Sequence, residues 1–232
     1  MRLFTLLFSG NQQTSAPYSP SLLPPPSPQA MYQDAVEKFK AREYKLALPL
    51  LQQCLAIFWQ KRGEKSVEVA NTFSTMASCY RDNHQMDEAI ECCKQALAIY
   101  SECKPDKLVE TKTKLQTCLA KCAPDKKQLY SEAVDEYKCK RYVVAKELLQ
   151  YLLTFAEQNQ ASEKDIAYYY STLASCEREM NENDSGLQHA KLAYALRKEL
   201  YGEVHELTKK DKEKVEVLEA RKEETSRSVL FQ

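Results

Sequence analysis

The sequence predicts an all-α protein, an α-solenoid in which antiparallel helical hairpins are stacked in a row. Apolar residues recur at i, i+3, i+4 and i+7 in successive stretches, which places them on one face of each helix. Only three or four polar residues join paired stretches, so the paired helices are expected to lie antiparallel. Sustained alternation of apolar and polar residues is absent, as are Asn-Gly and Asp-Gly turns, so no strands are predicted.

An internal duplication sets the order of these helices. Residues 74–81 (STMASCYR) match residues 171–178 (STLASCER) at an offset of 97 positions. Residues 34–48 match residues 132–146 at an offset of 98, and LLQ follows shortly after both segments. A unit of about 97 residues is therefore used twice, which predicts two similar lobes, each made of two hairpins and one extra helix.

The duplication divides the chain into four parts. Residues 1–29 hold six of the nine prolines and are predicted to be a disordered Pro-rich leader. The first lobe is predicted at 30–125, and the second lobe, with a charged C-terminal capping helix, at 126–228. Residues 229–232 (VLFQ) match the recognition string of a picornaviral protease used to remove tags, so they are interpreted as a tag scar.

The leader contains one apolar run, Leu3 to Phe8, directly after Arg2. This run is short for a secretory signal, and proline follows it in place of a small-residue cleavage site. A secretory signal and an organellar presequence stay open as alternatives, and so do an internal start at Met31 and a vector-derived origin of residues 1–30.

Each hairpin carries large apolar residues on its first helix and small residues on its second helix, where neighbours pack closely. Enlarging a small residue there is expected to strain the packing. The residues that define the four hairpins in order are Ala35, Phe39, Tyr44, Ala47 and Cys54; Phe73, Met76, Ala77, Tyr80, Ala89, Cys93 and Ala96; Ala133, Tyr137, Tyr142, Ala145 and Leu152; and Tyr170, Leu173, Ala174, Gly186, Ala190 and Ala193.

One further helix is predicted to close each lobe. The first spans residues 107–122 and follows Pro105, which suits a first helical turn. The second spans residues 206–225 and is far more polar, as expected of the cap on an open solenoid end. Four residues are predicted to mark helix ends elsewhere: Ser66 and Ser162 as starts, and Gly63 and Gly202 as stops.

These positions resemble the tetratricopeptide repeat (TPR) over residues 30–202. Within that family, residues 69–112 and 195–208 resemble the kinesin light chain type of repeat. The resemblance implies an open α-solenoid whose first helices line a concave groove that binds cargo peptides. The kinesin light chain type favours asparagine on the groove side just before Leu-Ala, whereas this chain has Ser74-Thr75 and Ser171-Thr172 there.

Composition excludes several functions. Lysine plus arginine and aspartate plus glutamate both number 33, so the formal net charge is zero and nucleic acid is not an expected partner. Four glycines and the absence of GxGxxG or GxxxxGK[ST] strings argue against a phosphate-binding loop. No run of 18 apolar residues occurs, so no membrane span is predicted.

The nine cysteines are odd in number and mostly fall within helical patterns. We expect reduced, mostly buried thiols and therefore a cytoplasmic protein, with cytoskeletal or ciliary association left open. Two groups could hold a metal or respond to oxidation, although neither shows the paired knuckles of a zinc site, and no metal or cofactor is predicted. The groups are Cys92, Cys93 and Cys103, and Cys118 with Cys122.

An enzyme is not predicted. His84 is expected in a turn, His189 on a second helix and His205 near a loop. None has a serine, cysteine or carboxylate at the spacing of a catalytic triad or of HExxH.

The carboxylate clamp by which chaperone-binding tetratricopeptide repeats hold C-terminal tails is also not predicted. The clamp uses lysine and asparagine side chains on the first helices, because a buried anion needs charge-assisted hydrogen bonds. The corresponding positions here carry Tyr32, Val36 and Thr75 in the first lobe and Tyr130, Val134 and Thr172 in the second. Chaperone C-terminal tails are therefore not expected ligands.

The remaining candidate is the groove itself, which is expected to bind a protein or peptide. Arg81 and Arg178 are equivalent in the two lobes and would hold acidic groups, and three tyrosines would make rigid aromatic contacts. The alternative is that the arginines pair with Asp82 and Glu179 and the tyrosines only pack. The residues predicted to face the groove are Tyr32, Asn71, Ser74, Ser78, Arg81, Tyr130, Tyr168, Ser171, Ser175 and Arg178.

The sequence thus predicts a non-catalytic adaptor or scaffold that binds a partner peptide or helix on a concave face. Two other classes stay open: a metal- or redox-responsive protein that uses the cysteines, and an accessory helical domain of a larger enzyme.

Overall fold

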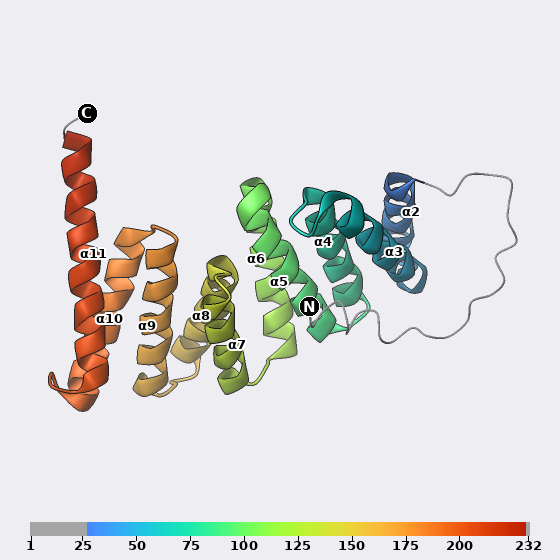
Figure 1. Cartoon of the computed structure of the whole chain (residues 1–232). Coiled ribbons are helices and arrows are strands. Elements are labelled where there is room, and N and C mark those ends of the chain that lie inside the picture. Colours follow the sequence, from blue (N-terminus) through green and yellow to red (C-terminus); the bar gives the residue numbers. More distant parts are fainter. Residues whose placement is uncertain (1–26, 231–232) are drawn as a thin grey trace, which may run out of the picture.

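The computed structural model describes the backbone of residues 27–230 and the side chains of residues 27–224. In this part of the chain every regular element is a helix, and the helices follow one another in an open row (Figure 1). The predicted all-α solenoid of helical hairpins is confirmed. The helices are α2 (Pro28–Lys40), α3 (Tyr44–Arg62), α4 (Val67–Asp82), α5 (Met86–Cys103), α6 (Leu108–Cys122), α7 (Lys126–Lys138), α8 (Tyr142–Gln158), α9 (Glu163–Glu179), α10 (Asn183–Tyr201) and α11 (Glu206–Leu230), with a 3-10 turn η1 (Pro105–Lys107) before α6.

The two predicted end segments fall largely outside the described residues. Helix α2 already begins at Pro28, inside the segment predicted as a leader, because the Ser27 hydroxyl accepts a hydrogen bond from Ala30 N at 3.2 Å and caps the helix. Residues 1–26 of the leader and residues 231–232 of the proposed tag scar lie outside the description. No helix within the described residues is long and apolar enough to cross a membrane.

The predicted helix ends are found where expected. Ser66 caps α4 and accepts a hydrogen bond from Val69 N, and Ser162 is the residue before α9. Gly63 and Gly202 end α3 and α10 with φ of 85° and 80°, a region that favours glycine.

The turns inside the four hairpins share one backbone conformation that the sequence did not reveal. Each turn has three residues, and the middle one is left-handed, with φ between 60° and 62°. The amide of the third residue donates to a carbonyl five positions earlier, as Gln85 N does to Tyr80 O at 2.9 Å, which is a Schellman arrangement. None of the four left-handed residues is glycine: they are Arg42, His84, Lys140 and Asn181.

The core is continuous along the row. One cluster of buried apolar side chains runs from Ala35 to Cys176, across the predicted lobe boundary at residue 125, and a second contains Ala174, Leu187, Ala190 and Leu218. The small residues predicted between helices are buried in these clusters or beside them; Ala89 and Ala145, for example, are fully buried. The hairpins therefore pack through small side chains, and the division into two lobes stays a prediction.

The closing helices α6 and α11 occupy equivalent places after the second and fourth hairpins, α6 against α5 and α11 against α10. The outer face of α6 meets α8: Lys112 Nζ lies 2.7 Å from Glu147 Oε1, and the Tyr151 hydroxyl donates to Leu119 O at 3.1 Å. Leu119 is fully buried, whereas Glu216, its counterpart 97 positions later on α11, is exposed. The role of α11 as a cap on the solenoid end stays a prediction.

Candidate partner-binding face

The first helices of the hairpins lie side by side on one side of the row. Helix α2 contacts α4, and α4 contacts α6; in the second half α7 contacts α9, and α9 contacts α11. We call this side the first-helix face. It carries the ten residues predicted to face a groove, on α2, α4, α7 and α9.

Two equivalent tyrosines join neighbouring helices on this face. The hydroxyl of Tyr32 lies 2.8 Å from Thr75 Oγ1, and that of Tyr130 lies 3.0 Å from Thr172 Oγ1. Burial raises the pKa of both phenols, so both hydroxyls stay protonated well above neutral pH. These contacts hold α2 to α4 and α7 to α9.

The next pair of positions differs between the two halves. In the first half, the Tyr100 hydroxyl donates to Asn71 Oδ1 at 2.7 Å. In the second half, these positions carry Arg197 and Tyr168, and the guanidinium carbon of Arg197 lies 4.9 Å from the centre of the Tyr168 ring. A cation–π contact thus takes the place of a hydrogen bond.

The four predicted serines are buried, and this corrects the expectation that they are exposed in a groove. Ser78 and Ser175 donate to the carbonyls of Ser74 and Ser171, one helical turn earlier, at 3.2 and 3.0 Å. Ser74 accepts a hydrogen bond from Lys114 Nζ of α6 at 3.0 Å. Ser74 and Ser171 therefore bond to the closing helices α6 and α11, whereas the Ser78 and Ser175 bonds stay within α4 and α9.

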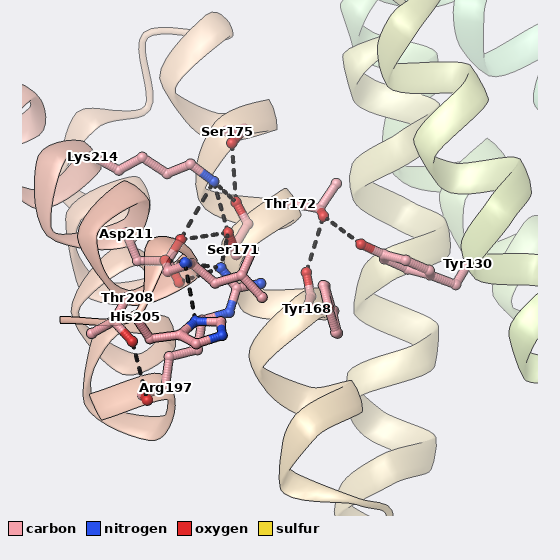
Figure 2. A network of polar contacts seen from close by, with 11 residues as sticks. Tyr130, Tyr168, Ser171, Thr172, Ser175, Arg197, His205, Thr208, Asp211 and Lys214 are labelled. Atoms are coloured by element: carbon pink, nitrogen blue, oxygen red, sulfur yellow. Dashed lines mark hydrogen bonds and ion pairs between the residues drawn. The ribbon is translucent and has the colours of Figure 1, made fainter. Parts of the chain in front are cut away.

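Ser171 belongs to a buried polar network between α9, α10 and α11, shown in Figure 2. Its hydroxyl donates a hydrogen bond to Asp211 Oδ1 at 2.6 Å and accepts one from Lys214 Nζ at 2.7 Å. Arg197 Nη1 lies 2.7 Å from Asp211 Oδ2, and Asp211 is fully buried. Burial lowers the pKa of Lys214; Asp211 opposes this, and the positive charges of Arg197 and Arg178 add to it.

The two predicted arginines are half-buried and paired with their neighbours. Arg81 Nε lies 2.8 Å from Asp82 Oδ1, and Arg178 Nη2 lies 2.8 Å from Glu179 Oε1. The Arg178 carbonyl also accepts from Arg221 Nη1 of α11 at 3.2 Å. The pairing offered as the alternative at the sequence level is thus present, while both guanidinium groups keep part of their surface exposed.

Six of the predicted residues therefore remain partly exposed on the first-helix face: Tyr32, Asn71, Arg81, Tyr130, Tyr168 and Arg178. The sequence reasoning missed the residues behind them. The duplication could have pointed to them, because residues 97 positions apart occupy equivalent places in the two halves. This offset pairs Tyr100 with Arg197 and Lys114 with Asp211. The residues missed are Tyr100, Lys114, Arg197, Asp211 and Lys214.

The histidines have structural surroundings. His84 is the left-handed residue of a turn. The His189 ring stacks on Tyr170, and its Nδ1 lies 2.6 Å from Glu177 Oε2. His205 Nδ1 accepts from Leu207 N at 3.2 Å.

The cysteines form one close pair. All nine are free thiols and six are buried. The Cys93 and Cys118 thiols, on α5 and α6, share a hydrogen bond that raises the pKa of Cys93 and lowers that of Cys118 to about 7. Among the described residues, no group of three or more histidine, cysteine, aspartate or glutamate side chains is arranged to hold a metal ion.

Comparison with known proteins identifies the repeat. Residues 35–102 match the family model described as tetratricopeptide repeat. The search of curated proteins found no match. A solved structure of a Podosopora anserina putative kinesin light chain with nearly identical TPR-like repeats is 14% identical, covers 88% of this chain and 90% of its own, and has a TM-score of 0.36. A TPR2AB-domain complex of yeast Sti1 with pHSP90 is also 14% identical, covers 73% and 64%, and has a TM-score of 0.33.

Proposed function

We propose that this chain, whose residues 35–102 are tetratricopeptide repeats, is a non-catalytic adaptor that docks a protein or peptide on its first-helix face. The tetratricopeptide fold is that of a protein-interaction scaffold, which supports the general class. The finer proposal is that the six partly exposed residues of this face make the contacts. A single peptide contact of this kind would have a micromolar dissociation constant, about −8 kcal/mol.

The observation that carries the proposal is the fixed support beneath the exposed side chains. Tyr32 and Tyr130 are held by Thr75 and Thr172, and Tyr168 lies under the Arg197 guanidinium. Side chains already fixed before binding lose little rotamer entropy when a partner arrives. Such a face favours docking by rigid aromatic groups.

The partner is expected to carry acidic groups. The cations Arg178, Arg197 and Lys214 lie close enough together for the first two to lower the pKa of the third. A carboxylate brought to the exposed part of Arg178 would form a charge-assisted hydrogen bond with its guanidinium beside Glu179, and Arg81 beside Asp82 offers the same group in the first half. The protein is proposed to act in the cytoplasm, where reduced thiols persist.

Affinity purification with the native protein beside the double variant Arg81→Glu, Arg178→Glu tests this function. A matched control changes the same number of charges at two exposed positions on second helices, Arg62→Glu on α3 and Lys198→Glu on α10. Proteins retained by the native chain and the control but lost from the double variant would be ligands of the first-helix face. Retention of every captured protein by the double variant would show that the arginines do not bind the partner.

A redox-responsive role is the second candidate, and the hydrogen-bonded pair Cys93 and Cys118 favours it. Oxidation of the two thiols by one hydrogen peroxide would join the two sulfur atoms and release two waters. Peroxide treatment of the folded protein should then lower its mass by about 2 Da. If Cys93→Ser shows the same loss, the pair is not the site.

A further inference from the structure

Helix α3 carries an apolar stripe on the outer side of the first hairpin. Leu46, Pro49 and Leu50 lie on one helical face by their spacing; Leu46 is 55% exposed, Pro49 is exposed and Leu50 is half-buried. We call these three residues the α3 stripe. Leu46 has the largest exposed fraction among the exposed leucines of the described chain.

The second half of the molecule shows what such a stripe does when it is covered. The counterparts 98 positions later are Val144, Glu147 and Leu148 on α8, and all three are buried. Helix α8 contacts α5 and α6, and Glu147 meets α6 directly: Lys112 Nζ lies 2.7 Å from Glu147 Oε1, and Gln116 Nε2 donates to Glu147 O at 2.9 Å. The α3 stripe holds the same register, but within the described residues no helices equivalent to α5 and α6 precede the first hairpin.

One sequence difference between α3 and α8 indicates which side chains could cover the α3 stripe. Position 147 is a buried glutamate that needs the cation and amide of α6, whereas its counterpart in α3 is Pro49. An occupant of the α3 stripe therefore needs apolar side chains and no donor. The exposed end of a second copy does not meet this need, because the α11 positions equivalent to Gln116 and Leu119 are Glu213 and Glu216, and burying a carboxylate on an apolar stripe is costly.

We propose that Leu3–Phe8 (LFTLLF) of the same chain covers the α3 stripe. It holds five of the seven leucine and phenylalanine residues among residues 1–26, and every position except Thr5 is apolar. Residues 1–26 lead directly into Ser27, the cap of α2, and α2 packs directly on α3. Eighteen residues separate Phe8 from Ser27 and span at most about 60 Å when extended, while the stripe is only about 6 Å long.

Hydrogen exchange on the full chain tests the proposal. We expect the amides of residues 3–8 to exchange at least about fivefold more slowly than in a free peptide of residues 1–26, because docking excludes solvent. The variant Leu46→Arg should restore free-peptide exchange. The control Leu192→Arg changes a leucine of similar exposure, 46%, on α10 at the other end of the row and should leave the protection intact.

A second variant keeps the test independent of the folded row. Leu7→Ser lies in the segment itself and should remove the protection while circular dichroism stays unchanged. Free-peptide exchange in the native chain, or protection that survives Leu46→Arg, would overturn the proposal. Protection that grows with protein concentration would assign the stripe to a second copy, and would overturn it as well.

Discussion

Arg197 and Asp211 form an ion pair of 2.7 Å in which both side chains are almost completely buried, one on α10 and the other on α11. Ser171 and Lys214 complete the network around the carboxylate. In the first half the equivalent positions are Tyr100 and Lys114, so the two halves fix their closing helices by different chemistry. The attachment of α11 depends on a buried ion pair, in which Arg197 Nη1 meets the Asp211 carboxylate while Arg197 Nε has no hydrogen-bond partner among the described residues.

The variant Asp211→Asn should lower the free energy of unfolding by about 3 kcal/mol, because it leaves the Arg197 guanidinium buried without a counter-charge. Chemical denaturation measures the change. The control Glu219→Gln breaks the exposed pair between α11 and Lys191 and should cost less than about 1 kcal/mol. Equal costs for the two variants would mean that the buried pair does not stabilise α11.

The variant His84→Gly should stabilise the protein by about 1 kcal/mol, because His84 adopts a left-handed conformation that costs a side chain about this much. The matching variant Asn181→Gly should gain less, since asparagine tolerates this region better. Thermal unfolding of both variants provides the comparison. A loss of stability in His84→Gly would indicate that the imidazole makes a contact worth more than the backbone strain.

The variant Ala89→Arg should loosen the second hairpin and lower the free energy of unfolding by about 1–3 kcal/mol, because Ala89 is fully buried between helices. Ala120→Arg introduces the same side chain at an exposed position of α6 and serves as the control. Thermal melting distinguishes the two. An unchanged melting temperature for Ala89→Arg would contradict the assignment of Ala89 as a packing position.

Acid should weaken the buried ion pair between Lys94 and Glu91 on α5, which lies beside Glu136 of α7. Lys94 Nζ lies 2.8 Å from Glu91 and 3.8 Å from Glu136. Burial raises the pKa of Glu91, but the Lys94 charge outweighs it, and the pKa lies below the usual 4.5. The stabilisation from Glu91 is therefore present above pH 4.5 and is lost as the pH falls through the lower folded value.

The variant Lys94→Met should reverse this pH dependence. Without the ammonium, burial outweighs the remaining Arg141 charge, so it raises the pKa of Glu91 and raises further the already raised pKa of Glu136. Protonation then relieves the folded state, and its stability rises as the pH falls toward the folded values. Chemical denaturation of the native protein and of Lys94→Met from pH 7 to pH 4 measures the free energy of unfolding of each. The difference between the two free energies should shrink as the pH falls. A constant difference would show that Lys94 does not control these carboxyl groups.

The helices and their packing residues could be predicted because periodic apolar residues and small residues leave a local signal. Ala89, Ala145 and the stops at Gly63 and Gly202 are found as predicted. The hairpin turns could not be predicted in detail, since Arg42 and Lys140 adopt a conformation normally signalled by glycine. Their carbonyl acceptors lie in the preceding helix, so the turn follows from the helix end and not from the turn residues.

The candidate face was predicted less well than the fold. Helical spacing places Ser74 and Ser171 on the correct side of their helices, but it does not show that α6 and α11 cover them. The lysines and Asp211 that bind these serines come from helices about 40 residues away. Pairings between distant polar residues leave no periodic trace, and only the comparison of the two halves points to them.

The exchange of Leu119 for Glu216 limits how far the array can grow. A third unit joined behind α11 would have to press its first hairpin onto an ionised side chain that now faces water. Elongation at that end is thus penalised by exposed charges, Glu216 first among them, and the number of hairpins in the described chain is four. A designer who wished to lengthen the molecule would have to begin by making residue 216 apolar.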